Sequence, residues 1–318
     1  MENTKRNMSR HTKDERKTAN KSTSRAKGGV YAPRNRDRSF ERRDENARPK
    51  RVSLPPQNDS SEDAIPIENG IHGDYENGAV IGRNAVRELL RSERAIDKLM
   101  VQRGERTGSI VVLVAEAIER GIPVIEVEKS KLDALSGYAP HQGIIALAAE
   151  KEYCDVDDIL SLAKERGEDP LIVICDGITD PYNLGAIIRC AECCGAHGLI
   201  IPKRRAVGLT PLVTKASAGA IEHLAIAKVS NIASTVEALK KQGVWVYAAE
   251  AGGESHYKTD LKGPCAIVLG SEGNGVSQLV RKTCDGIISI PMYGKVNSFN
   301  VSTAAAILLA EAARQHHN

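Results

Sequence analysis

The sequence of 318 residues has few aromatic residues, no disulfide pattern and no long apolar run. Its seven cysteines are scattered and odd in number, which excludes the framework of a small disulfide-stapled domain. No run reaches the roughly 18 apolar residues of a membrane-spanning helix. The N-terminus also lacks the apolar core of a secretory signal. We therefore expect a soluble, cytoplasmic protein with no membrane partner.

Several common catalytic patterns are also missing. Loop 270–275 has the order G-x-x-G-x-G, so it is neither the GxGxxG dinucleotide fingerprint nor a P-loop, and a nicotinamide oxidoreductase is disfavoured. No HExxH zinc motif occurs, and Cys190, Cys193 and Cys194 have no second cysteine pair at zinc spacing. We interpret this cluster as packed helix surface, with a metal or redox role as the alternative. No metal site is expected.

Basic residues are concentrated at the N-terminus. Residues 1–51 hold 17 Lys/Arg and 7 Asp/Glu, whereas residues 52–77 hold no Lys/Arg and 6 Asp/Glu. With few large apolar residues, 1–77 cannot offset the entropy cost of folding, so we expect a disordered charged tail. The basic part is either simply solvated or attracts phosphate backbones nonspecifically.

A βα-alternating pattern begins at Gly78. The apolar spacing predicts helices over 84–91, 109–120 and 131–135, and strands over 96–101, 122–127 and 143–148. Residues 78–151 are therefore expected to form a small α/β domain. Its polar residues Arg83, Asn84, Arg103, His141 and Gln142 are either ordinary surface or, where they lie in loops, a binding face.

A larger domain is expected at 169–318, after a polar linker at 152–168 that contains a short helix. Nearly continuous apolar runs predict strands over 171–175, 199–201, 224–229, 244–248, 265–269 and 286–290. Helices are predicted over 183–194, 210–220 and 235–242, and a last helix opens at 302–303. Such strands are typical of a parallel sheet covered on both faces, so the fold class is α/β.

The first candidate motif, 176–191, follows a strand and opens a helix. Asn183 is placed to cap that helix, after a turn at Asp180 and Pro181. Leu184 begins an apolar stripe, and Arg189 points about 140° away from it at 100° per residue. Arg189 is therefore either a solvated surface arginine or one that faces a phosphate.

Two further loops follow strands. Loop 270–275 (GSEGNG) is a Gly-rich turn in which Glu272 would repel a phosphate, so it suits a neutral or positive ligand. Stretch 297–302 (NSFNVS) supplies amides and hydroxyls without charge. Helix capping by Asn300 or Ser302 explains one of these residues but not both loops together. Ligands of open α/β sheets bind in such loops beyond the strand ends.

Together, the three stretches resemble the motifs of the SPOUT superfamily, in its SpoU/TrmH branch of RNA ribose 2′-O-methyltransferases. The matching residues are Asn183, Gly185 and Arg189, then Gly270, Glu272, Gly273 and Gly275, then Asn297, Ser298, Asn300 and Ser302. The smaller domain is similar to the L30e-like substrate-binding domain of the RlmB subgroup, through 82–86 (GRNAV) and 141–143 (HQG). The resemblance covers roughly 78–318.

The resemblance implies a knotted (trefoil) parallel-sheet methyltransferase domain at 169–318, behind an L30e-like RNA-binding domain at 78–151. It also implies a homodimer with sites near the subunit interface, and S-adenosyl-L-methionine as cofactor. The implied cofactor-binding residues are Leu269, Gly270, Gly275, Ile290, Met292, Ser298 and Phe299. The implied RNA-binding residues are Arg83, Asn84, His141, Gln142 and Arg189.

The residues that this resemblance implies to be catalytic are Arg189, Asn183, Glu272, Ser298 and Asn300. Because arginine stays protonated in proteins, we expect Arg189 to anchor a phosphate and stabilise developing alkoxide charge rather than act as a base. Asn183 would orient Arg189 or the ribose. Glu272 would fix its loop and pair with Arg189 or the equivalent arginine of a second subunit. Ser298 and Asn300 would position ribose and cofactor.

The expected substrate is a guanosine of 23S ribosomal RNA, because the extra L30e-like domain distinguishes the ribosomal-RNA subgroup from the plainer tRNA enzymes. A tRNA or another rRNA nucleotide is the alternative substrate. A catalytically silent RNA-binding protein of the same fold is the alternative function.

Overall fold

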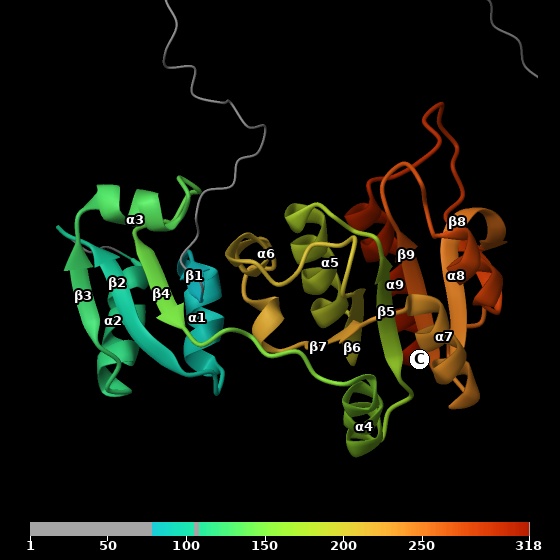
Figure 1. The fold of residues 1–318 in the computed structure, drawn as a ribbon, viewed down its shortest axis with the longest axis horizontal. Coiled ribbons are helices and arrows are strands. Elements are labelled where there is room, and N and C mark those ends of the chain that lie inside the picture. The colour runs from blue at the N-terminus through green and yellow to red at the C-terminus, as the bar shows by residue number, and fades with distance from the viewer. Residues whose placement is uncertain (1–77, 105–107, 318) are drawn as a thin grey trace, which may run out of the picture. The chain divides into compact units, whose positions relative to one another are not determined.

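The computed structural model describes residues 78–104 and 108–317, which form two sheets with their helices (Figure 1). The tail expected at 1–77 lies outside the described residues. No helix in these two ranges is long and apolar enough to cross a membrane.

The smaller domain is a four-stranded mixed sheet. Its elements are β1 (Ala79–Ile81), α1 (Arg83–Arg91), β2 (Ile96–Gln102), α2 (Ser109–Glu119), β3 (Val124–Val127), α3 (Lys129–Leu135) and β4 (Ile144–Ala148). The strand order is β1-β4-β2-β3, with β4 antiparallel to both neighbours. All the elements predicted for this domain are present. Strand β1 was not predicted, because three residues are too few to show a periodic pattern.

The larger domain is built on a six-stranded parallel sheet. Its elements are α4 (Val156–Arg166), β5 (Leu171–Asp176), α5 (Pro181–Cys193), β6 (Gly198–Pro202), α6 (Pro211–Ala216), the 3₁₀ turn η1 (Ala220–Glu222), β7 (Ala225–Val229), α7 (Ile232–Lys241), β8 (Trp245–Ser255), β9 (Cys265–Gly270), α8 (Gln278–Thr283), β10 (Gly286–Ser289) and α9 (Val301–His316). The strand order is β10-β8-β9-β5-β6-β7, and every neighbouring pair is parallel.

Both faces of this sheet are covered, as the apolar strands predicted. Alternate residues of β5 enter different cores: Leu171, Val173 and Cys175 pack with α5 and α9, whereas Ile172 and Ile174 pack with α4, α7 and α8. A strand with period-two side chains can bury every residue only when helices cover each face. The α/β parallel-sheet prediction is therefore confirmed, and the threading of the C-terminal segment stays a prediction.

A long bulge interrupts the pairing of β8 with β10. Ile287 pairs with Ala248, but the next residue, Ile288, pairs with Glu254. Residues 249–253 of β8 are thus skipped, and β8 extends well beyond the predicted strand 244–248. The two strands separate at this point because the skipped residues loop away from the ladder.

The start of α5 differs from the prediction. Asp180 is the N-cap, and its carboxylate accepts a hydrogen bond from the Tyr182 backbone N–H, while Pro181 occupies the first turn. The prediction that Asn183 caps this helix is wrong, because a proline at the first helical position already fixes the helix start before Asn183. Asn183 lies inside the helix and is buried. Its side chain is therefore free for another contact.

Two other helices differ from what the sequence predicted. The predicted helix 210–220 ends at Ala216, because Ala218 and Gly219 adopt positive φ values of 53° and 100° and break it. Helix α8 was not predicted, since six residues give a weak periodic signal. By contrast, the packing interpretation of the cysteine cluster holds for Cys190 and Cys194, which pack against the core.

One buried histidine fixes the entry to β5. His197 is 2% exposed, its Nδ1 accepts from the Leu171 backbone N–H at 3.0 Å, and its Nε2 lies 2.9 Å from the Glu168 carboxylate. Burial lowers the pKa of His197 below 6.5. The hydrogen bond to Glu168 raises this pKa, but by less than burial lowers it. Protonation of Nδ1 would remove the acceptor that holds Leu171.

We predict that the free energy of unfolding decreases as pH falls through 6.5 toward the lower pKa of folded His197, because the unfolded residue binds the proton that the folded residue resists. The loss begins as pH falls through 6.5 and ends below the folded pKa. Urea unfolding at several pH values measures it. His197→Gln should flatten the pH dependence, and the exposed His317→Gln should not. Equal slopes in all three proteins would contradict this assignment.

Candidate active site

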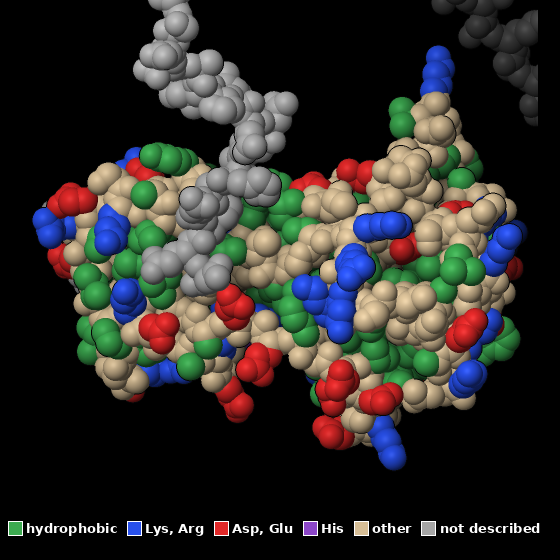
Figure 2. Space-filling model, in the orientation of Figure 1, with side chains coloured by type: hydrophobic (Ala, Val, Ile, Leu, Met, Phe, Trp, Pro, Cys, Tyr) green, Lys and Arg blue, Asp and Glu red, His purple; other side chains and the backbone are tan. Residues whose placement is uncertain are grey.

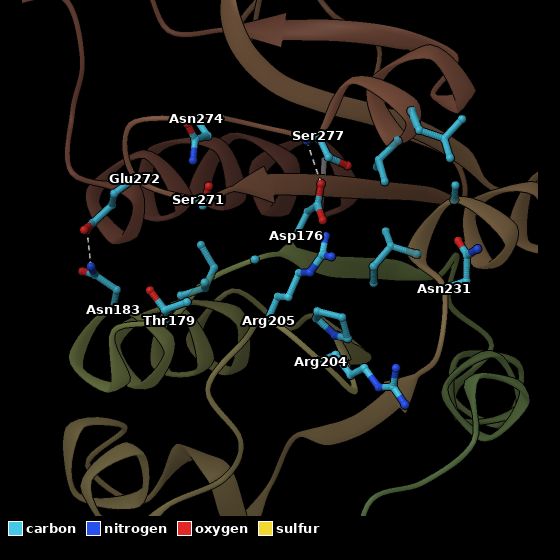
Figure 3. A pocket seen from close by; sticks show the side chains of 18 of the residues that line it. Asp176, Thr179, Asn183, Arg204, Arg205, Asn231, Ser271, Glu272, Asn274 and Ser277 are labelled. Carbon is cyan, nitrogen blue, oxygen red and sulfur yellow. Dashed lines mark hydrogen bonds between the residues drawn. The ribbon is translucent and has the colours of Figure 1, made fainter. Parts of the chain in front are cut away.

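The three predicted motifs meet through one carboxylate at the carboxyl edge of the sheet. Glu272 Oε1 accepts a hydrogen bond from Asn183 Nδ2 (Figure 3). Asn300 Nδ2 lies 3.4 Å from the same oxygen. Asn300 Nδ2 also donates to Asn183 Oδ1 at 3.0 Å. The start of α5, the loop after β9 and the start of α9 are thus held together by amides and a carboxylate. This group of three is called the Asn–Glu–Asn cluster below.

Asn300 has a second role as the N-cap of α9. Its Oδ1 accepts from the backbone N–H groups of Ser302 at 2.9 Å and Thr303 at 3.4 Å. The expected capping by Asn300 is confirmed. Because its oxygen faces the helix, its nitrogen must point toward Asn183 and Glu272, so helix capping orients the cluster.

Two glycines allow the loop that carries Glu272 to close tightly. Ser271 and Gly275 exchange backbone hydrogen bonds at 3.1 and 2.9 Å. A Cβ on Gly270 would lie 2.0 Å from the Gly275 carbonyl carbon, and Gly275 has a φ of 64°. Gly270 is therefore required by close approach of the backbone, and Gly275 by its left-handed conformation.

Two acids that sequence reasoning did not assign fix the end of this loop. Glu250 Oε1 accepts from the Val276 N–H at 3.2 Å, and Asp176 Oδ2 accepts from the Ser277 N–H at 2.7 Å. Asp176 could have been found as an acid at the end of a buried strand. No pattern identifies Glu250, because it lies in the bulge of β8.

Arg189 does not join the Asn–Glu–Asn cluster within one chain. It lies on α5 six residues beyond Asn183, about 9 Å farther along the axis and about 120° away in projection. Its side chain is exposed and lines a separate cavity with Glu192 and Cys193. The expected contact of Asn183 or Glu272 with Arg189 is absent from the described residues of this chain.

An apolar cavity collects four of the predicted cofactor-binding residues. It is lined by Ile290, Met292, Ser298 and Phe299 together with Ile288, Leu308, Asn297 and the bulge residues Ala249, Glu250 and Ala251. The other three predicted residues lie elsewhere: Leu269 is buried in the core, Gly270 closes its loop, and Gly275 faces the cavity drawn in Figure 3.

Three of the four predicted RNA-binding residues of the smaller domain, Arg83, His141 and Gln142, line a cavity of about 440 Å³. His141 is buried, with Nε2 3.0 Å from Asp133 and Nδ1 accepting from the Gly143 N–H. Gln142 has a φ of 56°, and its carbonyl accepts from Arg83 Nε at 3.1 Å. His141 and Gln142 thus shape the loop. Asn84 lies outside this cavity and accepts from Arg87.

The chain is similar to known proteins along most of its described length. Residues 170–310 match the model of the SpoU rRNA Methylase family, and residues 79–154 match that of RNA 2′-O ribose methyltransferase substrate binding. YacO of Bacillus subtilis (strain 168), named as a TrmH family tRNA/rRNA methyltransferase, is 44% identical over 239 residues, which cover 75% of this chain and 96% of YacO. The chain belongs to the TrmH/SpoU family of RNA 2′-O ribose methyltransferases.

Other relatives of this TrmH/SpoU protein extend the comparison. A protein of Staphylococcus haemolyticus (strain JCSC1435) with the same family name is 45% identical over 241 residues, covering 75% of this chain and 96% of the relative. The SpoU methyltransferase AviRb from Streptomyces viridochromogenes, solved with AdoMet, has 27% identity and a TM-score of 0.62, covering 74% of this chain and 89% of AviRb. The AdoMet-bound rRNA methyltransferase from Sinorhizobium meliloti has 26% identity and a TM-score of 0.62. The match covers 74% of this chain and 86% of that enzyme.

We predict that Asn300→Ala and Asn300→Asp separate the two roles of this residue. Alanine removes the cap and should lower the free energy of unfolding by about 1 kcal/mol. Aspartate keeps the cap, so stability should fall less, but it brings a carboxylate against Glu272 and removes the amide donor. Both variants should lose methyl transfer. Urea unfolding and a methyl-transfer assay measure the two effects, and an active Asn300→Asp variant would contradict the donor role.

Proposed function

We propose that this protein transfers the methyl group of S-adenosyl-L-methionine to the ribose 2′-oxygen of a guanosine in 23S ribosomal RNA, as a cytoplasmic homodimer. The observation that carries the proposal is the Asn–Glu–Asn cluster. Asn183 and Glu272 line a larger cavity, and Ser298 and Phe299, which directly precede Asn300, line the apolar one. A cluster of neutral amides around a carboxylate orients hydroxyl groups, which is what a ribose presents.

The apolar cavity has the chemistry to hold the cofactor. Its aliphatic lining and Phe299 suit a nucleoside, and Glu250, Asn297 and Ser298 supply polar contacts. The cavity measures about 160 Å³, and ligand pockets usually begin at roughly 300 Å³. We therefore expect segment 291–299, exposed along nearly its whole length, to shift outward when the cofactor enters, while Asn300 stays fixed at the start of α9. When bound, the cofactor supplies the methyl group on a sulfonium that leaves readily.

The chain itself supplies positioning and charge. Asn183 and Asn300 are fixed by Glu272 and orient the ribose, while Ser298 extends toward the cofactor cavity. Arg189 stays cationic, anchors a phosphate and stabilises negative charge that develops on the 2′-oxygen. Preorganised groups of this kind lower the barrier because they need no rearrangement during reaction.

The separation of Arg189 from the cluster favours a site shared by two chains. Within one chain, Arg189 faces Glu192 and Cys193 on the exposed side of α5. In a homodimer with an isologous interface, the same exposed surface of each chain meets the other, so Arg189 of each chain can serve the cluster of its partner.

The smaller domain would bind RNA away from the reacting ribose. Arg83, Arg103 and Lys129 line its cavity and can contact phosphates. This additional domain is the reason for favouring 23S rRNA over tRNA. Two relatives are named as tRNA/rRNA methyltransferases, so tRNA is the alternative substrate. Methylation of a tRNA would change the proposed substrate but not the proposed reaction.

We predict that labelled S-adenosyl-L-methionine transfers its methyl to one guanosine ribose of unmodified 23S rRNA, and that Arg189→Ala lowers kcat by about 10²–10³-fold. Arg189→Lys should stay well below the wild type, because lysine cannot contact a phosphate through two parallel N–H groups. Arg166→Ala, on an exposed arginine of α4, is the control.

Mapping the labelled nucleotide decides between the substrates. Label in a tRNA would replace the 23S proposal, and label on a base would overturn the ribose reaction. If the protein binds the cofactor but transfers no methyl group to either RNA, the remaining alternative is a catalytically silent RNA-binding protein of the same fold. An Arg189→Lys variant with nearly full activity would overturn the two-point phosphate contact.

We further predict that mixing inactive Arg189→Ala and Asn300→Ala chains restores activity. If each site takes Arg189 from one chain and Asn300 from the other, half of the re-equilibrated dimers carry one intact site, so activity should reach about a quarter of the wild type. Equal mixing after mild denaturation, followed by the methyl-transfer assay, tests this. Sites contained within one chain would give no recovery.

A further inference from the structure

A second cavity is larger than the apolar one. It measures about 650 Å³ and lies at the carboxyl ends of β5, β6, β7 and β9. Asn183 and Glu272 line one end, and Arg204 with Asn231 the other, with Arg205 between them (Figure 3). The cavity therefore begins at the cluster that orients the ribose and continues away from it. Its volume exceeds what a ribose alone needs.

The two arginines project from a loop whose backbone is fixed at both ends. The Lys203 N–H donates to the Val229 carbonyl at 2.7 Å, and the Val207 N–H donates to the Ile178 carbonyl at 2.9 Å. Between these anchors, Arg205 holds a φ of 60°, which is rare for a residue with a side chain. Such a conformation persists only where its surroundings impose it, and it is concentrated at functional sites.

The charges of Arg204 and Arg205 are not neutralised within the part of the chain that the structure describes. Both side chains are exposed, and neither has a hydrogen bond or ion pair with another described residue. Figure 2 shows Lys and Arg side chains gathered over the β5–β7 part of the sheet, while acidic side chains gather over α4.

The acids that line the cavity are occupied by neutral donors. Asp176 accepts from the Ser277 N–H, Asp180 from the Tyr182 N–H, and Glu272 from Asn183. The cavity therefore has an end suited to hydroxyl groups and an end suited to phosphates. An RNA strand presents these two groups in alternation along its backbone.

We propose that this cavity binds the nucleotide that adjoins the methylated ribose, with Arg204 and Arg205 contacting its backbone phosphates. The inference rests on the proposed RNA methyl transfer and adds the path of the strand. With the target ribose at the Asn–Glu–Asn cluster, the adjoining nucleotide enters the cavity and its phosphate reaches the 203–207 loop. Asn231, Asn274 and Thr179 supply neutral donors and acceptors for its sugar and base.

The test compares RNA binding by the wild type and Arg204→Gln/Arg205→Gln, in which side-chain length is nearly kept and both charges are lost. Filter binding of a radiolabelled, unmodified 23S rRNA transcript is measured without cofactor at several KCl concentrations. Each phosphate contact contributes about one unit to the slope of log Kd against log salt, so the slope should fall by about two. At low salt, Kd should rise by about tenfold or more.

Two further variants make this result specific. Lys164→Gln/Arg166→Gln removes the same charge from exposed positions of α4, beyond the opposite end of β5, and should leave the slope nearly unchanged (Figure 1). Arg204→Lys/Arg205→Lys keeps the charge and should retain most of the slope. Thermal unfolding of every variant checks that the fold is intact.

The outcomes separate this inference from the proposed function. A slope and Kd equal to those of the α4 variant would overturn the phosphate site. Loss of cofactor binding with unchanged RNA binding would assign the cavity to the cofactor instead. Displacement of RNA by guanosine monophosphate alone, with no arginine-dependent salt slope, would indicate a free-nucleotide site and also overturn it. Arginine-dependent binding without methyl transfer would keep the phosphate site and reject the enzyme.

Discussion

Glu272 is the residue on which the arrangement of the site depends, because its carboxylate is shared by side chains from two helices. Asn183 belongs to α5 and Asn300 to α9, and the two are 117 residues apart in sequence. A hydrogen bond to a charged acceptor contributes about 1.5–3 kcal/mol, more than one between neutral groups. The carboxylate also fixes which way each amide points, since only the nitrogen can donate to it. Orientation is thus determined by charge, and packing only brings the helices near.

The loop of Glu272 separates two cavities of different character. The adjacent backbone N–H groups of Val276 and Ser277 donate to two different acids: Glu250 lines the apolar cavity, and Asp176 lines the larger cavity drawn in Figure 3. One short loop is therefore anchored to acids that line two different cavities.

The parallel sheet was predictable from the sequence because its strands are apolar at nearly every position, which is typical of a sheet covered on both faces. The sequence also placed three distant motifs at one edge, since loops after parallel strands share that edge. It misassigned Asn183 as a cap because two capping signals, Asp180-Pro181 and Asn183, lie within one turn. It did not find Glu250 or Arg204 and Arg205. Their roles depend on a bulge and on a loop fixed by distant carbonyls, and neither leaves a periodic pattern.

The bulge in β8 contributes part of the lining of the apolar cavity. Residues 249–253 are skipped in the ladder, and three of them line the cavity. A contact made through a peptide group survives most amino-acid replacements at that position, because every residue carries the same carbonyl. Phe299 and Met292 contribute large side chains to the same cavity, so they are the positions at which a substitution would most change its shape.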